Sequence, residues 1–477
     1  MQQEPIASID LMERAATACT QWLMVSGLQN KLIKIFCGTG NNGGDGLAIA
    51  RLLVEKGINP AVYVIGDDLK GSNDFQINLK KLQSFSEIHF IDSQNEFPAI
   101  DKDDLIIDCL FGSGLNRPLE GINKEILEHI NTSNAVVVSI DTPSGMFIDK
   151  SSKSNSIVKA DHVLTFQSLK LCFLVAENAV YFGKVEVLDI KLNKKFPESV
   201  DTIFELVDEQ LVTSYIKPRN EFSHKGTYGH ALLIAGNKGK MGAAVLAARA
   251  CLRSGVGLLT VNIPAEQSPI IQETVPEAMV AMREDALPGL DKFSAIGIGP
   301  GLGTDERSEK IVFNILEQSK HSVLLDADAL TILSTHTGWL KKIPAGSILT
   351  PHPKEFERVF GVCENDFERL EKAIEQSKQY PFIIILKGHY TLISSNGKGY
   401  FNNTGNAGLA KGGSGDTLTG IITSLLAQGY GSLEAAITGV WLHGSAADLA
   451  LETQSMESML PSDLIEFIGK AFDRLRK

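Results

Sequence analysis

The run Cys37-Gly-Thr-Gly-Asn-Asn-Gly-Gly-Asp-Gly46 stands between a short apolar segment, residues 32–37, and a segment of helical character, residues 47–56. Five of the nine residues from Gly38 to Gly46 are glycines, and glycine lets the backbone approach a ligand closely with its N–H groups turned inward. A helix that starts after such a loop adds partial positive charge. The stretch therefore predicts a strand–loop–helix unit that binds an anionic group such as phosphate.

The same run contains a literal match to the dinucleotide-binding fingerprint. Gly38-x-Gly40-x-x-Gly43 has the required spacing, and Asp67 follows at about the distance of the acidic residue that binds ribose. This match alone is weak. It is sharpened by the pair Asn41-Asn42 and the acid Asp45, which an ordinary fingerprint does not require. A plain dehydrogenase is therefore the least favoured enzyme class, and a glycine-rich turn without a ligand stays open as an alternative.

Composition limits the classes of protein to be considered. The chain has 477 residues and a net charge of −12, so it is too long for one ordinary core and two domains are expected. The scattered acidic residues argue against nucleic acid or an anionic membrane as a partner. The six cysteines include no Cys-x-x-Cys pair, which favours buried free thiols in a reducing cytosol. Without a basic leader or a long apolar run, the expected location is the cytoplasm.

The first half of the chain repeats one pattern, an apolar run that ends in Gly, Asp and Ser. Strands are expected at residues 61–65, 105–108, 135–140, 162–166 and 185–190, and Ser8 is expected to cap a helix that reaches Trp22. Such runs indicate a parallel sheet that is buried on both faces. Ligands of these sheets bind beyond the carboxyl ends of the strands. Residues 41–45, 108–114 and 141–144 should therefore meet at one edge and form a site.

The second half restarts the pattern after a segment of mixed charges and prolines, residues 191–220, where we place the domain boundary. A strand is expected at residues 231–235, an Ala-rich helix at 243–254 and a strand at 258–262. Further strand ends are expected at Gly299–Gly303, Asp326–Asp328, Thr350–Glu355 and Lys387–His389, and a hairpin over residues 383–402.

The strongest motif of the second half is Gly405-Asn-Ala-Gly-Leu-Ala-Lys-Gly-Gly-Ser-Gly-Asp416, which precedes an apolar helix. Its glycines free backbone amides at the helix N-terminus, and Asp416 lies where these amides converge. A carboxylate in this place would deprotonate a hydroxyl, while the amides stabilise charge on a transferring phosphoryl group. The alternative is that Asp416 only caps the helix.

The motif Gly412-Gly-Ser-Gly-Asp416 resembles the phosphoryl-transfer signature of the ribokinase-like superfamily. Gly40–Gly46, Asp108–Gly114 and Val138–Gly145 resemble the epimerase domain of NAD(P)H-hydrate repair enzymes. His224–Gly226, Gly299–Gly303, Thr350–Glu355 and Lys387-Gly388 resemble the dehydratase domain of the same system. The resemblance covers nearly the whole chain in the same order. It implies an α/β fold with two three-layer αβα domains, a Rossmann-like epimerase domain at residues 1–205 and a ribokinase-like dehydratase domain at residues 206–477.

This resemblance implies a bifunctional enzyme, an isomerase fused to a lyase, that repairs hydrated NADH and NADPH. In these hydrates water has added across the reduced nicotinamide ring and leaves a hydroxyl on a carbon next to nitrogen. The first domain would interconvert the R and S hydrates. The second would phosphorylate the S hydrate with ADP and eliminate phosphate, which yields NAD(P)H and AMP. The resemblance also implies a homo-oligomer with small-molecule substrates and with K⁺ and Mg²⁺ as cofactors.

The resemblance carries site residues over one by one. In the epimerase domain the hydrate would contact Asn41, Asn42, Gly43, Gly44, Asp45, Gly112, Ser113, Gly114, Leu115, Asn116, Arg117, Pro118 and the catalytic Asp141. K⁺ would be bound by the hard oxygen ligands of Asn42, Asp108 and Ser144. In the dehydratase domain the hydrate would contact Ala243, Gly301 or Gly303, His352 and the catalytic Asp416, and the nucleotide would contact Lys387, Gly388, His389, Tyr390, Thr391 and Gly415. A direct metal role for Glu355 is in doubt, because His352 replaces the Asn of the kinase motif Asn-x-x-Glu.

Two alternatives remain at this point. The second domain would show the same anion hole and base if it were an ordinary ribokinase-like small-molecule kinase. The first domain would then be a non-catalytic Rossmann-like binding module. The presence of Asp141 and of the Asn41-Asn42 pair argues against this interpretation, because a scaffold has no need of them.

Overall fold

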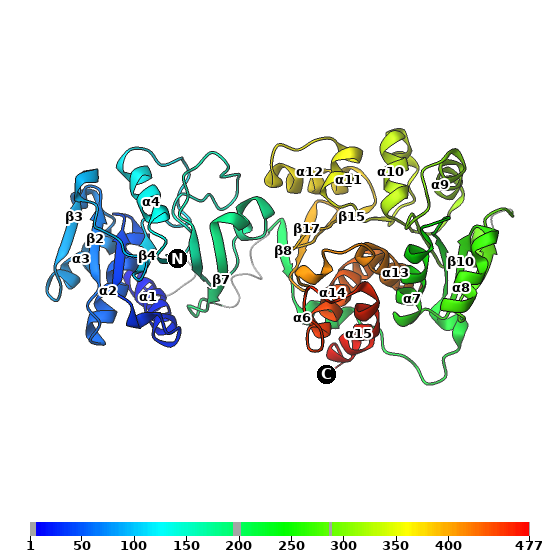
Figure 1. Ribbon diagram of the computed structural model, residues 1–477, viewed down its shortest axis with the longest axis horizontal. Helices are drawn as coiled ribbons and strands as arrows, with labels where there is room; N and C mark the ends of the chain where they lie inside the picture. Colours follow the sequence, from blue (N-terminus) through cyan, green and yellow to red (C-terminus); the bar gives the residue numbers. More distant parts are fainter. Residues whose placement is uncertain (1–5, 194–201, 286–288, 477) are drawn as a thin grey trace. The chain divides into compact units, whose positions relative to one another are not determined.

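The computed structural model describes residues 6–193, 202–285 and 289–476. The chain forms two compact units, Met1–Asp201 together with Asn365–Phe367, and the remainder of Thr202–Lys477. Each unit is a sheet covered by helices on both faces (Figure 1). The predicted fold class, two three-layer αβα domains, is confirmed.

The first unit contains a seven-stranded sheet in the order β3-β2-β1-β4-β5-β6-β7, and all neighbouring strands are parallel. The strands are β1 (Ile33–Cys37), β2 (Ala61–Ile65), β3 (Ile88–Ile91), β4 (Leu105–Cys109), β5 (Val136–Ile140), β6 (Ala160–Phe166) and β7 (Phe182–Leu188). Every residue of β1 and β4 is buried, as expected for strands covered on both faces. The strand order reverses between β1 and β4, and ligands of doubly wound sheets bind at that point.

The helices of the first unit are α1 (Ser8–Val25), α2 (Asn41–Glu55), α3 (Asn73–Gln83) and α4 (Ile122–Thr132). α2 packs against both α1 and α3 on one face of the sheet. α4 lies on the opposite face (Figure 1), because right-handed crossovers that run toward the two edges of a parallel sheet place their helices on opposite sides.

Two predictions at helix starts were wrong. α2 begins at Asn41, so the glycine run is the first part of the helix and not a loop before it. A Cβ atom at Gly43 would lie 1.6 Å from the carbonyl oxygen of Gly38, and only glycine permits this approach. Ser8 is the first residue of α1 and does not cap it, because its hydroxyl donates to Asp74 at 2.5 Å instead.

The second unit contains a ten-stranded sheet in the order β11-β10-β9-β12-β13-β14-β15-β16-β17-β8. The strands are β8 (Phe204–Val207), β9 (His230–Ile234), β10 (Leu258–Ile263), β11 (Met279–Met282), β12 (Ala295–Ile298), β13 (Val323–Leu325), β14 (Ile348–Leu349), β15 (Ile383–Leu386), β16 (Leu392–Ser395) and β17 (Lys398–Asn402). β15, β16 and β17 pair antiparallel, which confirms the predicted hairpin. β8 pairs in parallel with β17 and forms the edge.

The helices of this unit are α6 (Glu209–Tyr215), α7 (Met241–Arg253), α8 (Ser268–Thr274), α9 (Glu306–Gln318), α10 (Ala327–Thr335), α11 (Pro353–Phe360), α12 (Asp366–Gln379), α13 (Ser414–Ala427), α14 (Ser432–Ala450) and α15 (Pro461–Arg474). Figure 1 shows α7, α13, α14 and α15 on one side of the sheet and α9 to α12 on the other. α13 is buried from Thr417 to Ala427 and packs most extensively on α7. This packing fixes the position of the α13 N-terminus and therefore of Asp416.

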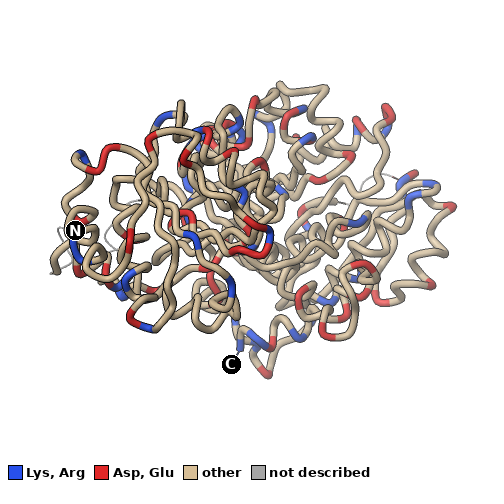
Figure 2. The backbone as a smooth tube through the Cα atoms, turned by 60° about the vertical axis from the view of Figure 1, so that its left-hand side comes forward, with Lys and Arg blue, Asp and Glu red and all other residues tan. Residues whose placement is uncertain are grey.

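The cysteines and the charged residues are distributed as the sequence predicts. All six cysteines are free and buried. Figure 2 shows basic and acidic residues interspersed along the chain. Among the residues that the structure describes, none of the helices combines the length and apolar character needed to cross a membrane.

We expect Gly420→Ala to destabilise the second unit. The new Cβ would lie 2.1 Å from the carbonyl oxygen of Ala247 on α7, and overpacking of this kind costs about 1–3 kcal/mol. Thermal unfolding monitored by circular dichroism should show a lower midpoint. The matched control is Gly469→Ala on α15, where no atom lies within 4 Å of the added Cβ and the helix should gain about 1 kcal/mol. Equal midpoints for the two variants would contradict the packing argument.

Candidate functional site

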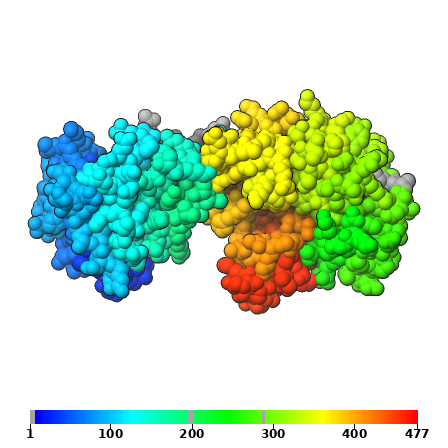
Figure 3. Space-filling model, turned by 45° about the horizontal axis from the view of Figure 1, so that its top comes forward, coloured from blue at the N-terminus to red at the C-terminus, as the bar shows by residue number. Residues whose placement is uncertain are grey.

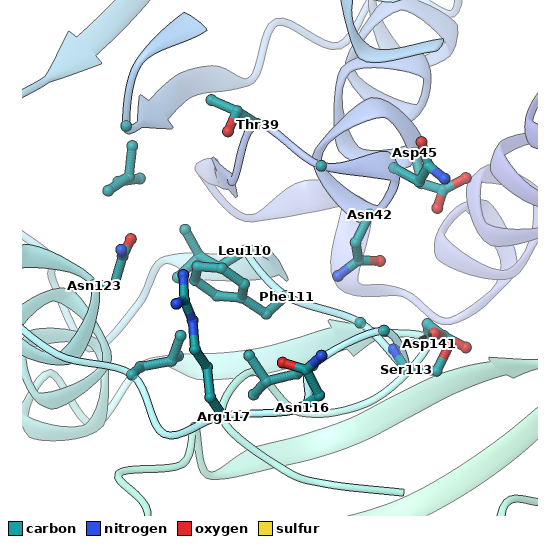
Figure 4. A pocket seen from close by; sticks show the side chains of 18 of the residues that line it. Thr39, Asn42, Asp45, Leu110, Phe111, Ser113, Asn116, Arg117, Asn123 and Asp141 are labelled. Carbon is teal, nitrogen blue, oxygen red and sulfur yellow. Dashed lines mark hydrogen bonds between the residues drawn. The ribbon is translucent and has the colours of Figure 1, made fainter. Parts of the chain in front are cut away.

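The first candidate site is a pocket of about 1090 Å³ at the carboxyl edge of the first sheet. Figure 4 shows its walls, which come from the segments after β1, β4 and β5. The lining includes most residues that the resemblance named, Asn41, Asn42, Asp45, Gly112, Ser113, Gly114, Leu115, Asn116, Arg117, Pro118 and Asp141. Gly43 and Gly44 are not part of the lining; they are buried where α2 approaches Gly38 and Met12.

Asp141 follows β5 with a φ of 70°, a conformation that is rare for a residue other than glycine and that is often found at functional sites. Its Oδ2 accepts a hydrogen bond from the Ser113 N–H at 2.8 Å. Its Oδ1 lies 2.8 Å from the Lys170 ammonium nitrogen. Burial raises the pKa of Asp141, but the charge of Lys170 and these hydrogen bonds outweigh burial, so the pKa lies below its ordinary value. Asp141 is therefore a carboxylate at neutral pH.

The sequence analysis missed Lys170. It lies in the segment that follows β6, and its ammonium also donates to the Thr165 hydroxyl. No local motif marks this lysine, because only the adjacency of β5 and β6 brings it to Asp141. The only sequence feature that could have indicated Lys170 is its place among the polar residues after β6, because β6 borders β5, the strand that precedes Asp141.

Asp45 lines the same pocket from α2, but its environment is opposite to that of Asp141. Burial raises the pKa of Asp45 well above its ordinary value, and the charges of Asp141 and Asp74 raise it further. Among the described residues of this unit, no basic side chain pairs with Asp45. The pocket thus holds one carboxyl group whose pKa is lowered and one whose pKa is raised.

Asp108 and Ser144 are in direct contact below the pocket. The buried Asp108 carboxylate accepts hydrogen bonds from the Ser144 hydroxyl at 2.5 Å, the Ser144 N–H at 2.9 Å and the Ser139 hydroxyl at 2.7 Å. Burial still raises its pKa above the ordinary value. Asn42 lies nearby, with its amide facing the Ile140 carbonyl and the Gly112 N–H.

Asp67 does not take the role that the dinucleotide fingerprint suggests. It follows β2, caps the short 3-10 helix η2 (Asp68–Lys70) and pairs with Lys70 at 2.9 Å. It is not part of the pocket lining. The glycine run therefore serves the pocket through Asn42 and Asp45 and not through a ribose contact at Asp67.

The second candidate site surrounds Asp416 in the first turn of α13. Gly413 precedes this helix with a φ of 100°. No side chain caps the helix N-terminus among the described residues, so no hydrogen bond there supports the capping alternative for Asp416. Burial raises the pKa of Asp416 to about 6, the charges of Asp326 and Asp328 raise it further, and the charge of Lys387 opposes them. Asp416 can thus release and accept a proton near neutral pH.

Lys387 and Asp326 form a partly buried ion pair beside Asp416. The Lys387 ammonium lies 3.0 Å from Asp326 Oδ1 and 3.8 Å from Glu355 Oε2, and the Thr419 hydroxyl donates to Asp326 at 2.8 Å. Burial lowers the pKa of Lys387, but the two carboxylates raise it above its ordinary value. Asp326 had been recognised only as a strand end, because its role depends on two residues far along the chain.

His352 has a structural explanation for its position. It caps α11, where its Nδ1 accepts from the Lys354 and Glu355 N–H groups and the Glu355 carboxylate accepts from its N–H at 2.9 Å. Burial lowers its pKa. The other predicted hydrate contacts are Ala243, Gly301 and Gly303, which follow β9 and β12. A Cβ at Gly301 would lie 3.2 Å from Ala243 Cβ. The Gly303 N–H donates to Asp328 at 2.8 Å.

A cavity of about 710 Å³ adjoins the α13 N-terminus. Figure 3 shows this part of the second unit hollowed between the yellow and orange segments. The cavity is lined by most of the predicted nucleotide contacts, namely Lys387, Gly388, His389, Thr391 and Gly415, but not by Tyr390. His443, which the sequence analysis missed, also lines it; its Nε2 lies 3.0 Å from the Ser414 carbonyl oxygen, and burial lowers its pKa to about 4.

We expect Ser144→Ala to destabilise the first unit by about 1–3 kcal/mol, because it leaves the buried Asp108 carboxylate with one donor fewer. The matched control is Thr142→Val two residues earlier. The Thr142 hydroxyl is buried and has no hydrogen-bond partner among the described residues, so its removal should be neutral or stabilising. Denaturant midpoints of both variants check this difference, and a larger loss for Thr142→Val would contradict it.

Two family models match the chain. The model of the YjeF-related protein N-terminus matches residues 8–172, and the model of NAD(P)H-hydrate dehydratase matches residues 231–470. The chain is 33% identical to the bifunctional NAD(P)H-hydrate repair enzyme Nnr of Moorella thermoacetica, over 97% of this chain and 92% of the relative. It is 34% identical to the enzyme of the same name from Coxiella burnetii, over 96% and 94% of the two chains.

Solved structures resemble the second unit. An ADP/ATP-dependent NAD(P)H-hydrate dehydratase from Bacillus subtilis, co-crystallised with ATP/Mg²⁺, matches with a TM-score of 0.51 and 36% identity over 56% of this chain and 97% of that chain. A ribokinase-like superfamily protein from Enterococcus faecalis matches with a TM-score of 0.53 and 28% identity over 58% and 98%.

Proposed function

The chain belongs to the family of bifunctional NAD(P)H-hydrate repair enzymes, and we propose that its first unit performs the epimerisation and its second unit the dehydration. The enzyme repairs hydrated NADH and NADPH by joining an epimerase to an ADP/ATP-dependent dehydratase. The observation that carries the division of labour is that each unit holds its own pocket. The pocket of the first unit is lined by Asp45 and Asp141, and the pocket of the second unit adjoins the first turn of α13, which carries Asp416. This division replaces the alternative of a kinase fused to a non-catalytic module.

In the dehydratase unit, Asp416 takes the proton of the hydrate hydroxyl. Its pKa of about 6 makes it a base at neutral pH that still accepts a proton readily. The backbone N–H groups at the α13 N-terminus stabilise negative charge on the phosphoryl group that the nucleotide donates. The carbon–oxygen bond then breaks and phosphate leaves with its electron pair, and the neighbouring ring carbon loses a proton, so that the double bond of NAD(P)H is restored. We propose ADP as the donor, bound against Lys387, Gly388, His389, Tyr390, Thr391 and Gly415, and hydrate contacts from Ala243, Gly301 or Gly303, and His352.

The described residues fit Mg²⁺ only as an ion that arrives with the nucleotide. No group of three His, Cys, Asp or Glu side chains suited to a metal occurs among them. Glu355 is occupied by the His352 N–H and by Lys387. Mg²⁺ commonly binds through substrate phosphates and water with few protein ligands, and we propose this arrangement here.

The first unit fits a monovalent cation such as K⁺. The Asn42 amide nitrogen donates to the Ile140 carbonyl at 3.2 Å, and the amide oxygen accepts from the Gly112 N–H at 3.3 Å. The oxygens of Asn42, Asp108 and Ser144 suit a hard cation, and we propose that they hold K⁺ close to Asp141.

We further propose that the enzyme works in the cytoplasm as a homo-oligomer with small-molecule substrates only. The buried free thiols favour a reducing compartment. Basic and acidic residues are interspersed along the described chain (Figure 2), and the net charge of −12 disfavours a nucleic-acid partner.

The purified protein should restore the absorbance of reduced nicotinamide from hydrated NADH when ADP and Mg²⁺ are added, and it should consume both epimers. Asp141→Ala should leave rapid use of the S epimer intact and slow consumption of the R epimer to the spontaneous rate. Recovery with ATP alone would revise only the donor. No recovery with either nucleotide would refute the dehydratase function.

Asp416→Asn should reduce dehydration by about 100- to 10,000-fold, because it removes the base, and should leave epimerisation unchanged. In the wild type the dehydration rate should fall as the pH drops through about 6, where Asp416 becomes protonated. The matched control is Asp291→Asn, an exposed carboxylate of the same unit. A variant that keeps normal turnover but unfolds at a lower temperature would give Asp416 a structural role.

A further inference from the structure

The epimerase pocket contains two carboxyl groups with different neighbours, because Asp141 has a basic partner and Asp45 has none among the described residues. Lys170 and the Ser113 N–H each contact one oxygen of Asp141 at 2.8 Å. Asp45, on the facing helix, receives no basic partner among the described residues. Figure 4 shows the two carboxyls reaching the pocket from different elements, with Asn42 between them.

The charge of Asp141 depends chiefly on Lys170. The titratable groups that act on it from the packed elements are Lys170, Asp45, Cys19 and Cys172. Both thiols stay neutral, since burial raises the pKa of Cys172 to about 12 and that of Cys19 well above its ordinary value. Arg117 also lines the pocket, but no ion pair joins it to either carboxyl. Without Lys170, burial would dominate and Asp141 would hold its proton more tightly.

Lys170 is itself well placed to act as a fixed charge. Its side chain is 17% exposed and that of Asp141 is 14% exposed, so solvent screens the pair weakly. The Thr165 hydroxyl accepts from the ammonium and fixes it beside the carboxylate. The ammonium of Lys170 is therefore held in one position beside the Asp141 carboxylate.

We propose that Lys170 divides the two carboxyls into a base, Asp141, and an acid, Asp45, and that both act in opening and closing the hydrate ring. This inference rests on the proposed epimerase function of the first unit. It makes Lys170 a positioning residue and Asp45 a catalytic residue beyond its expected role in binding. Two carboxyls whose environments separate their protonation states are suited to paired acid and base roles.

The proposed step balances as follows. Asp141 takes the proton of the hydroxyl on the hydrated carbon, the oxygen forms a carbonyl with that carbon, and the bond from the carbon to the ring nitrogen breaks. The nitrogen keeps the electron pair of this bond and takes the proton of Asp45. Rotation about the freed carbon–carbon bond presents the other face of the carbonyl. Reversal of both proton transfers closes the ring as the opposite epimer and restores both carboxyls.

Lys170→Met tests the positioning role in the full chain. Interconversion of the separated hydrate epimers is followed by chromatography without nucleotide, so that the dehydratase is idle. We expect the acidic limb of the pH–rate profile to be displaced upward by about one pH unit or more, because Asp141 loses its cation. The loss of rate should therefore grow as the pH falls below about 7. Lys170→Arg should restore both the rate and the limb. The matched control is Lys184→Met, an exposed lysine of β7 that pairs with Glu186 outside the pocket.

Asp45→Asn tests the acid independently of the lysine. The amide keeps the size and can still donate a hydrogen bond, but it cannot supply the proton, so epimerisation should fall about 100-fold or more. The acidic limb that reports Asp141 should stay in place. An unchanged acidic limb in Lys170→Met, or unchanged epimerisation in Asp45→Asn, would overturn the inference. Failure of the wild type to epimerise would instead overturn the proposed function, and dehydration of the S hydrate on adding ADP reports the second unit separately.

Discussion

The close contact between a helix backbone and the turn before it is the constraint on which the first site depends. The first turn of α2 lies so near the turn after β1 that a Cβ at Gly43 would overlap the Gly38 carbonyl. Because α2 starts at Asn41 without a longer loop, Asn42 and Asp45 are carried on its first turns and enter the pocket from a rigid element. The second unit uses the same device, since the contact of Gly420 with Ala247 seats α13 on α7 and so fixes Asp416.

The two sites share an electrostatic arrangement although their sheets differ. In each, a lysine pairs with one carboxylate, Lys170 with Asp141 and Lys387 with Asp326. A second carboxyl beside each pair, Asp45 or Asp416, has a raised pKa. The proposed reaction roles are reversed, because the paired carboxylate is the proposed base of the epimerase whereas the unpaired carboxyl is the proposed base of the dehydratase. The lysine therefore lowers the pKa of the carboxyl group it pairs with, but its placement alone does not fix which carboxyl group is the base.

Sequence reasoning predicted most strands of both sheets and the convergence of Asn42, Asp45, Ser113 and Asp141, because these depend on local apolar runs and on the geometry of parallel strands. It placed the start of α2 too late, since a glycine run does not show whether it is a loop or a helix that needs close packing. It missed Lys170, Asp326 and His443. Each of these residues contacts a partner on another element, and the spacing of residues along the sequence does not show which elements lie next to each other.

The pairing of the edge strand β8 depends on the order in which the ribosome makes the chain. β8 is the first element of that unit to leave the ribosome, but its partner β17 is translated only after most of the sheet. Until then β8 has no strand to pair with, and a lone strand edge can pair with other chains. A gene fragment that begins after Val207 would also lack the strand that completes the sheet. The dehydratase unit therefore includes β8, and the pairing of that strand waits until β17 has been made.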